Sequence, residues 1–362
     1  MSHQLDHVIG ARPNFIKAGP VIRALRERGV PQRVIHTGQH YDDRMSDVFF
    51  RELDLPAPDL YLGVGSGTHA EQTAATMTGL ERAWTPDSPA LVVVYGDVNS
   101  TLAASLVAAK QSIPSAHVEA GLRSFDRSMP EEINRIVSDL LADLLFTTSP
   151  EADDRLRAAG IPGARICFVG NPMIDTLLAH RSAFTSTEER DRLGLPEDYG
   201  VVTLHRPSNV DDLGAARAVV AALDGLAELV PLVLPLHPRG RPTLEEAGLR
   251  DRDRLRVVEP LGYLAFLSLV AGARLVLTDS GGIQEETTIL DVPCLTMRPN
   301  TERPITITHG TNRLVGPAEV VPAAREILAG PRRPGGPRPP LWDGQAGERI
   351  ADRIVTWLEA RA

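Results

Sequence analysis

The chain contains only two cysteines, Cys167 and Cys294, among its 362 residues. They lie far apart in the sequence, and each sits in an apolar, strand-like run, ICFVG and VPCLTM. We interpret both as small buried core residues, because free cysteine behaves as a small hydrophobe. This spacing argues against a disulfide, a cysteine-ligated metal ion and a cysteine nucleophile.

The chain also lacks an excess of positive charge and lacks long apolar runs. Its 38 Lys and Arg residues stand against 47 Asp and Glu residues, which gives a net charge of −9. Nucleic-acid-binding proteins concentrate Lys and Arg on one face, so nucleic acid is not an expected partner. No run of 18 apolar residues and no signal-peptide pattern occurs. We therefore expect a cytoplasmic protein without a membrane partner.

What the chain does have is the composition of a globular protein, with 43% hydrophobic and 23% charged residues. Its length fits two domains. Short β-branched runs alternate with helical patterns, and these runs are apolar throughout, as in parallel strands buried on both faces. The predicted fold class is therefore α/β, with two Rossmann-like domains.

The predicted strands are HVIGA, RVIHTG, LVVVYG, SAHVEA, LLFTTS, ICFVG, GVVTLH, LVLPLH, LRVVEP, LVLTDS and VPCLTM. The predicted helices span residues 15–28, 70–83, 100–110, 131–141, 215–229, 283–290 and 347–360.

The domain junction is expected where the series of strands pauses, between ICFVG and GVVTLH. This places an N-terminal domain at residues 1–172 and a C-terminal domain at residues 173–344. The segment 330–341, GPRRPGGPRPPL, is too rich in Pro and Gly for regular structure and is predicted to be a surface connector. The amphipathic helix within 345–362 could pack on either domain.

The strongest local signal is DSGGIQEE at residues 279–286, which follows the strand LVLT and opens a helix. Gly281 and Gly282 let backbone N–H groups approach an anion closely, and a diphosphate is the natural occupant. Glu286 lies about one turn into the helix, where a carboxylate can bridge the two hydroxyls of a ribose. A structural turn capped by Ser280 explains the same residues equally well.

Charged residues follow several other predicted strands. Arg12 and Lys17 in GARPNFIK lie at the carboxyl end of the sheet, where open α/β sheets bind ligands. Asp97, Glu119 and Glu131 are expected to converge on one crevice, where burial and mutual repulsion can raise a carboxyl pKa into the range useful for proton transfer. Taken singly, Asp97 and Glu131 are explained by helix N-capping and by compensation of the helix dipole. Three carboxylates at one edge favour an acid–base site.

Two histidines, His205 and His237, follow strands in the second half of the chain. Neither has the spacing of a metal-ligand set, so no metal site is predicted.

Ten motifs occur in this order: GARPNFIK, TGQHYD, YGDVNST, HVEAGLRS, PEEINR, GNPMID, HRPSN, LPLHPR, DSGGIQEE and TERP. In this combination the chain resembles the non-hydrolysing UDP-N-acetylglucosamine 2-epimerases over roughly residues 5–360. The resemblance implies a GT-B architecture, with two Rossmann-like domains facing a central cleft. It also implies that the second domain holds UDP, that the hexose faces the first domain, and that the last helix crosses back to the first.

The same resemblance implies the chemistry and the roles of the site residues. Asp97, Glu119 and Glu131 look like the acid–base carboxylates that remove and return the C2 proton, while UDP leaves and adds back through a 2-acetamidoglucal. His205 looks like a diphosphate contact that takes part in catalysis, and no cofactor is required. The substrate-binding residues implied are Arg12, Lys17, Arg135, His237, Ser280, Gly281, Gly282, Glu286 and Arg303. A homodimer is expected.

Several alternatives stay open at this point. The stretches TGQHYDDRMSDVFF and LPLHPR are similar to members that act on UDP-2,3-diacetamido-glucuronate, whereas TERPIT is closer to members acting on UDP-N-acetylglucosamine. A hydrolysing epimerase would release free N-acetylmannosamine. A GT-B glycosyltransferase would need an acceptor groove, and a sugar-nucleotide sensor would not need the three carboxylates.

Overall fold

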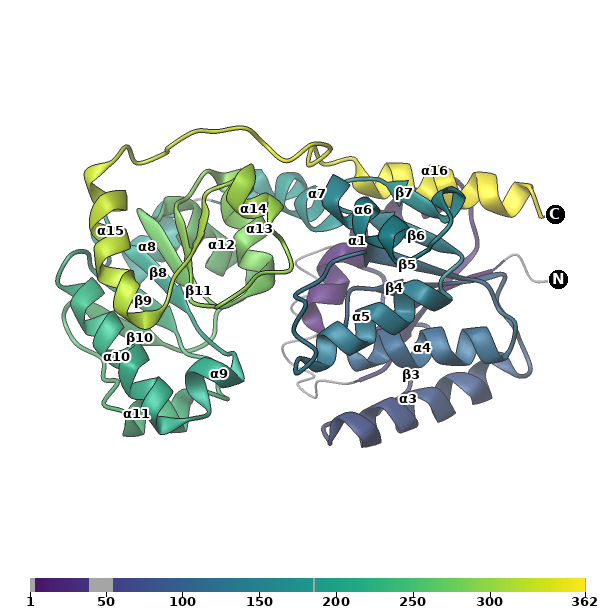
Figure 1. The fold of residues 1–362 in the computed structure, drawn as a ribbon, viewed down its shortest axis with the longest axis horizontal. Helices are drawn as coiled ribbons and strands as arrows, with labels where there is room; N and C mark the ends of the chain where they lie inside the picture. The colour runs from purple at the N-terminus through teal and green to yellow at the C-terminus, as the bar shows by residue number, and fades with distance from the viewer. Residues whose placement is uncertain (1–3, 39–54, 185, 362) are drawn as a thin grey trace. The chain divides into compact units, whose positions relative to one another are not determined.

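The computed structural model describes residues 4–38, 55–184 and 186–361, except for the side chains of Arg12 and Ser186. Contacts divide the chain into two compact units (Figure 1). Unit 1 comprises Met1–Ala179 and Pro340–Ala362, and unit 2 comprises His180–Pro339. Each unit is an α/β domain built on a parallel sheet, as the apolar runs predict.

Unit 1 contains the sheet order β3-β2-β1-β4-β5-β6-β7. Its strands are β1 (Leu5–Ile9), β2 (Gln32–His36), β3 (Leu60–Tyr61), β4 (Leu91–Tyr95), β5 (Ser115–Ala120), β6 (Leu144–Thr147) and β7 (Ile166–Phe168). Its helices are α1 (Arg12–Glu27), α3 (His69–Trp84), α4 (Asn99–Lys110), α5 (Pro130–Leu141), α6 (Pro150–Ala158), α7 (Pro172–Ala179) and α16 (Ala346–Glu359).

Unit 2 contains the sheet order β10-β9-β8-β11-β12-β13. Its strands are β8 (Gly200–Thr203), β9 (Leu232–Pro235), β10 (Leu255–Val258), β11 (Leu275–Thr278), β12 (Cys294–Thr296) and β13 (Asn312–Leu314). Its helices are α8 (Ser186–Arg192), α9 (Pro207–Val210), α10 (Leu213–Ala227), α11 (Arg241–Glu246), α12 (Tyr263–Gly272), α13 (Gly281–Leu290), α14 (Ile305–Thr308) and α15 (Val320–Ala329).

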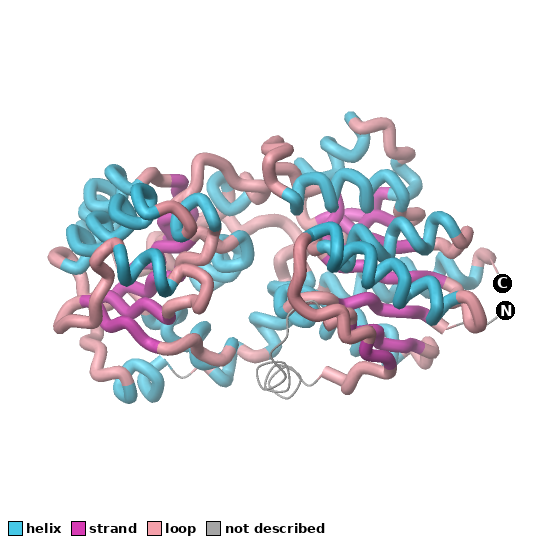
Figure 2. The backbone as a smooth tube through the Cα atoms, turned by 90° about the horizontal axis from the view of Figure 1, so that it is seen from below, coloured by secondary structure: helices cyan, strands magenta, loops and turns pink. Residues whose placement is uncertain are grey.

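Both sheets are covered by helices on their two faces, and this is why their strands are apolar without alternation (Figure 2). In β4, Val93 belongs to the same hydrophobic cluster as Leu25 of α1 and Ile350 of α16. The next residue, Val94, packs on the other face in a cluster with Trp84 of α3. Neighbouring residues of one strand are thus buried against opposite helical layers.

Helix α16 packs on α1 and α7, although it ends the chain (Figure 1). Asp175 in α7 accepts a hydrogen bond of 2.7 Å from the backbone N–H of Gly347, at the start of α16. A Cβ atom on Gly347 would lie 2.8 Å from the backbone carbon of Pro20 in α1. The close approach of α1 and α16 therefore requires glycine at this position.

The connector before α16 has no regular structure over residues 331–339, as its composition predicts. Two of its side chains bind carbonyl groups at the end of α12. Arg332 Nη2 donates to the carbonyl of Gly272 at 2.9 Å, and Arg333 Nη1 donates to that of Ala273 at 3.0 Å. The connector is therefore fixed to unit 2 by arginines that satisfy a helix C-terminus.

Each sheet has a switch point, where the strand order reverses direction. It lies between β1 and β4 in unit 1 and between β8 and β11 in unit 2. Open α/β sheets bind ligands beyond the carboxyl ends of the strands at this point. Most of the predicted site residues follow these four strands, so the topology alone brings them to two ligand-binding edges.

Among the described residues, no helix is both long enough and apolar enough to cross a membrane.

Candidate active site

The edge of unit 1 holds a buried ion pair between Lys17 in α1 and Glu119 in β5. Lys17 Nζ donates to Glu119 Oε2, and the two side chains are 5% and 2% exposed. Gly96, directly after β4, makes room for this pair. A Cβ atom there would lie 3.0 Å from Lys17 Nζ and 3.1 Å from Glu119 Oε2, and its φ of +64° also favours glycine.

Glu119 itself has an unusual backbone conformation. Its φ is +71°, and the register between β5 and β6 shifts between Val118 and Ala120. A bulge of this kind re-aims a side chain, and a positive φ on a residue other than glycine persists only when its surroundings enforce it. Such strain is typical of functional positions, and here it directs the carboxylate to Lys17.

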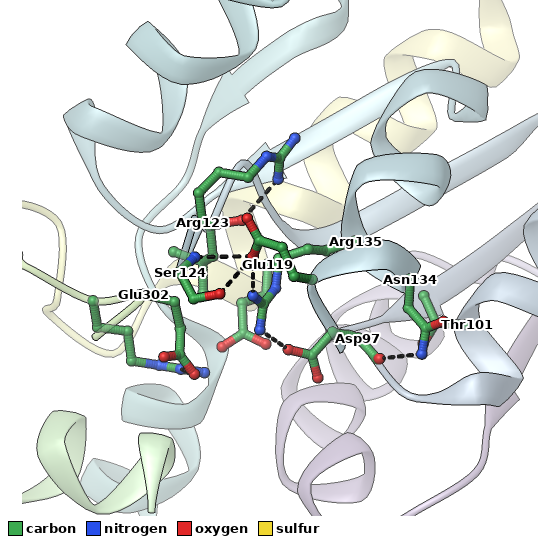
Figure 3. Close-up of polar contacts among 12 residues, drawn as sticks. Asp97, Thr101, Glu119, Arg123, Ser124, Asn134, Arg135 and Glu302 are labelled. Atoms are coloured by element: carbon green, nitrogen blue, oxygen red, sulfur yellow. Dashed lines mark hydrogen bonds and ion pairs between the residues drawn. The ribbon is translucent and has the colours of Figure 1, made fainter. Parts of the chain in front are cut away.

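Asp97 directly follows Gly96 in the sequence and is held by Arg135 of α5 (Figure 3). Arg135 Nη2 donates to Asp97 Oδ2 at 2.5 Å, and Asn134 Nδ2 donates to the Asp97 carbonyl at 2.8 Å. The Arg135 side chain is 2% exposed, whereas that of Asp97 is 25% exposed. The Asp97 carboxylate is therefore fixed in place but accessible.

Glu132, which is not among the residues predicted from the sequence, anchors the other end of Arg135. Its carboxylate accepts hydrogen bonds from Ser124 N, Ser124 Oγ and Phe125 N at 2.9–3.1 Å and from Arg135 Nη1 at 2.5 Å. Burial raises the pKa of Glu132, but the hydrogen bonds from Ser124 and Arg135 outweigh it and lower the pKa below its usual value. The spacing of Glu132 and Arg135, three residues apart on a helix, was a signal for this contact.

Two expectations about the carboxylates are wrong, at least in part. The N-cap residues of α4 and α5 are Val98 and Met129, so neither Asp97 nor Glu131 caps a helix, although Glu131 lies in the first turn of α5, where a carboxylate compensates the helix dipole. The expected repulsion between the carboxylates is not the main interaction of Asp97 or Glu119 either, because each of the two contacts a buried cation. Glu131 is half-buried in the first turn of α5, and no described residue forms a hydrogen bond with its side chain.

The edge of unit 2 begins with the N-terminus of α13. Ser280 is the N-cap, but its side chain makes no capping hydrogen bond, so the explanation by a Ser280 cap is wrong. The side chain of Gln284 donates to the Ser280 carbonyl at 3.0 Å and fixes the turn. A Cβ atom on Gly281 would lie 2.5 Å from Arg303 Nη1, which places a cation beside the positive end of the helix dipole.

Arg303 is buried between two carboxylates. Its Nε lies 2.9 Å from Glu285 Oε1 and its Nη1 lies 2.7 Å from Glu302 Oε1. Glu302 also pairs with Arg298, at 2.8 Å, and lies 3.8 Å from Arg206. This network holds cations at the α13 turn, an arrangement suited to a phosphate group.

His205 is oriented by Asp279, the last residue before the α13 turn. His205 Nδ1 lies 3.1 Å from Asp279 Oδ1, so Nδ1 donates and Nε2 is left for a ligand. Burial raises the pKa of Asp279, but hydrogen bonds from His205, Asn209 and the Arg206 backbone lower it below its usual value. The ring of His237 lies 6.0 Å from that of His205, centroid to centroid.

Glu286 is fully buried in α13, where Tyr263 Oη donates to its Oε1 at 2.9 Å. Burial is the main cause that raises the pKa of Glu286 to about 8; the hydrogen bond from Tyr263 lowers the pKa, and the neighbouring Glu285 raises it. Nothing in the sequence around Tyr263 indicates this contact.

The predicted residues therefore fall into two sets, one in each unit. The structure brings Lys17 to Glu119 and Arg135 to Asp97 in unit 1, and brings His205 to His237 in unit 2. Arg12 begins α1, but its side chain lies outside the described part of the chain, as do residues 39–42 of the TGQHYD motif. Within the described residues, no group of three His, Cys, Asp or Glu side chains could hold a metal ion.

Comparison with known proteins identifies the family. A family model described as UDP-N-acetylglucosamine 2-epimerase matches residues 23–355. The UDP-N-acetylglucosamine 2-epimerase of Methanocaldococcus jannaschii is 41% identical over 98% of this chain and 99% of that protein. The chain belongs to the UDP-N-acetylglucosamine 2-epimerase family. The resemblance carried by the ten motifs is confirmed, and so is the prediction of an enzyme of the isomerase class.

Another relative carries a different substrate in its name. The UDP-2,3-diacetamido-2,3-dideoxy-D-glucuronate 2-epimerase of Pseudomonas aeruginosa is 42% identical over 96% of this chain and 98% of that protein. The family therefore includes enzymes named for modified sugars at the same level of similarity.

Solved structures of the family share the fold of this chain. The M. jannaschii enzyme in complex with UDP-GlcNAc and UDP aligns with a TM-score of 0.90 over 98% of this chain and 99% of that chain, at 41% identity. A Staphylococcus aureus MnaA–UDP co-structure also gives 0.90, at 30% identity, over 99% and 97% of the chains. The GT-B-like fold class is confirmed. The glycosyltransferase of kitacinnamycin, at 16% identity and a TM-score of 0.54, shares the fold alone.

Proposed function

We propose that this epimerase-family chain interconverts UDP-N-acetylglucosamine and UDP-N-acetylmannosamine by reversible inversion at C2. The observation that carries the proposal is the carboxyl edge of unit 1. Asp97 lies just beyond β4 and Glu119 lies near the end of the adjacent strand β5, and each is held by a buried cation. Inverting the configuration at C2 requires a base that removes the proton from one face of the carbon and an acid that returns a proton to the other face. Carboxyl groups held in fixed positions suit both tasks.

The edge of unit 2 supplies what a leaving diphosphate needs. Backbone N–H groups of Gly281 and Gly282, the Ser280 hydroxyl and the Arg303 guanidinium stabilise the negative charge that develops as the bond to C1 breaks. Nε2 of His205 is oriented by Asp279 to contact the same group. Glu286 binds the ribose, while Arg12 and His237 complete the substrate contacts.

The reaction then has two reversible steps. A carboxylate among Asp97, Glu119 and Glu131 removes the C2 proton, and UDP leaves from C1 to give a 2-acetamidoglucal. UDP adds back to C1 while a second acidic group delivers a proton to the opposite face of C2. Lys17 and Arg135 hold the carboxylates in place throughout, because both are buried and paired with them.

This proposal assigns a task to each unit and a setting to the whole enzyme. Unit 2, whose bounds are close to those of the expected domain at residues 173–344, binds UDP. Unit 1, whose bounds are close to those of the expected domain at residues 1–172 joined by the helix at 345–362, acts on the hexose. The enzyme works as a cytoplasmic homodimer without a cofactor.

A second candidate substrate is UDP-2,3-diacetamido-2,3-dideoxy-D-glucuronate, favoured by the similarity to the P. aeruginosa enzyme. The two candidates are separated by incubating the purified protein with each nucleotide sugar and resolving the epimers by anion-exchange chromatography. We expect a gluco–manno mixture from UDP-N-acetylglucosamine. Turnover of the diacetamido sugar alone would replace the first candidate by the second. Free N-acetylmannosamine in amounts equal to UDP would establish a hydrolysing enzyme.

A further inference from the structure

Tyr263 and Glu286 form a polar pair inside unit 2 that the proposed reaction does not use directly. Tyr263 is the first residue of α12, after the N-cap Gly262, and is 7% exposed. Its hydroxyl donates to Glu286 Oε1 at 2.9 Å, and Glu286 is 2% exposed. A buried tyrosine and a buried carboxyl group from neighbouring helices thus share one hydrogen bond.

The other carboxylate oxygen of Glu286 has a different environment. No described residue donates to Oε2. The adjacent Glu285 offers no help, because it is a carboxylate itself and is paired with Arg303. Oε2 is not among the fully buried side-chain atoms that lack a hydrogen-bond partner, so a ligand hydroxyl can reach it, and a hydrogen bond to a carboxylate oxygen is a strong one.

We propose that Tyr263 is a positioning residue that gives this site its preference for a ribonucleotide over a deoxyribonucleotide. The inference rests on the proposed function, in which Glu286 binds the ribose of UDP. Tyr263 occupies Oε1, fixes the orientation of the carboxyl group and leaves Oε2 for the ribose hydroxyls. A ligand without the 2′-hydroxyl loses a hydrogen bond to this carboxyl group, and sites built to bind a hydroxyl group discriminate against ligands that lack it.

The test compares the affinities of UDP and 2′-deoxy-UDP by calorimetry, because their ratio reports on the ribose contact alone. We expect the wild-type protein to bind UDP at least about tenfold more tightly than 2′-deoxy-UDP. Tyr263→Phe removes only the hydroxyl, and the ratio should fall to within about threefold. A loss of stability alone would weaken both ligands equally and leave the ratio unchanged.

Tyr199→Phe is the matched control. Tyr199 is also buried, and its hydroxyl donates to a carbonyl of the same helix α12, that of Leu269, at 2.7 Å. It does not contact Glu286, so this variant should keep the wild-type ratio. Melting temperatures of both variants establish that each is folded.

A double-mutant cycle with Glu286→Gln completes the experiment. Glu286→Gln should itself reduce the ratio, and adding Tyr263→Phe should then change it no further. A wild-type ratio in Tyr263→Phe would overturn the inference and leave the proposed function intact, whereas a wild-type ratio in Glu286→Gln would overturn the inference and also the ribose contact assigned to Glu286, but not the inversion at C2. A wild-type protein that does not bind UDP would overturn both.

Discussion

The three candidate acid–base carboxylates differ in what surrounds them. Glu119 is buried against Lys17, Asp97 is partly exposed against Arg135, and Glu131 stands in the first turn of α5. None of them belongs to the α13 turn that is proposed to hold the diphosphate. Chemistry and nucleotide binding should therefore be separable by single substitutions.

Asp97→Asn, Glu119→Gln and Glu131→Gln should each lower turnover by roughly 10²–10⁴-fold, because acid–base groups contribute about this much. Their affinity for UDP should stay close to that of the wild type. Turnover assays and UDP calorimetry on the same preparations measure both effects, and melting temperatures identify any variant that fails to fold. Near-wild-type turnover in all three variants would eliminate the carboxylate mechanism.

Glu286 should make the stability of the protein depend on pH. Burial raises its pKa to about 8 in the folded state, whereas in the unfolded chain the carboxyl group ionises near its usual value of 4.5. Between these values the folded protein holds a proton that the unfolded chain releases, so this group's contribution to stability is lost as pH rises toward 8. Denaturant unfolding at pH 5, 6.5 and 8 should therefore show a smaller loss in the free energy of unfolding for Glu286→Gln than for the wild type. If the free energies of unfolding of the two proteins fell in parallel with pH, the raised pKa of Glu286 would be contradicted.

At the scale of single residues, the sequence indicated candidate site residues that stand in recognisable motifs, but it did not indicate the residues that hold their side chains in position. Asp97, Glu119 and Glu286 stand directly after strands or inside a motif, where topology places them at a ligand-binding edge. Tyr263 supports Glu286 from another helix, and no spacing in the sequence connects residues brought together only by packing. Side-chain partners of this kind depend on the folded structure.

At the scale of elements, the contact between α1 and α16 is the clearest structural constraint. Gly347→Ala would place a Cβ atom 2.8 Å from the Pro20 backbone, and backbone cannot move aside as a side chain can. We expect a loss of about 1–3 kcal/mol in the free energy of unfolding, the usual result of overpacking. Gly163→Ala is the control, because no atom lies within 4 Å of the added Cβ. Equal stability of the two variants by denaturant unfolding would show that α16 does not pack as described.

The predicted elements are those with the longest and most regular patterns. All eleven predicted strands and all seven predicted helices have counterparts in the structure, while β3, β13 and several helices were missed. β3 has only two residues, and β13 reads NRL, with two polar residues, so neither forms an apolar run. Helix α12 is apolar on most of its surface, LAFLSLVAG after Tyr263, so no amphipathic period marks it.

At the scale of the whole molecule, the ten motifs in order predicted the family and the fold class. The limits of the domains were harder to place. The sequence division assigns α7 to the second domain, whereas contacts group it with unit 1, because α7 packs on α1 and α16. The polar stretch after α7 is visible in the sequence, but the surface on which α7 packs is not.

The central claim is that this chain breaks and reforms the C2–H bond of a UDP-N-acetylhexosamine. Proton NMR of the purified protein with UDP-N-acetylglucosamine in heavy water tests it directly. The account predicts that deuterium enters C2 and that gluco and manno UDP-sugars form together without accumulation of free sugar. No exchange at C2 with any UDP-N-acetylhexosamine would contradict it.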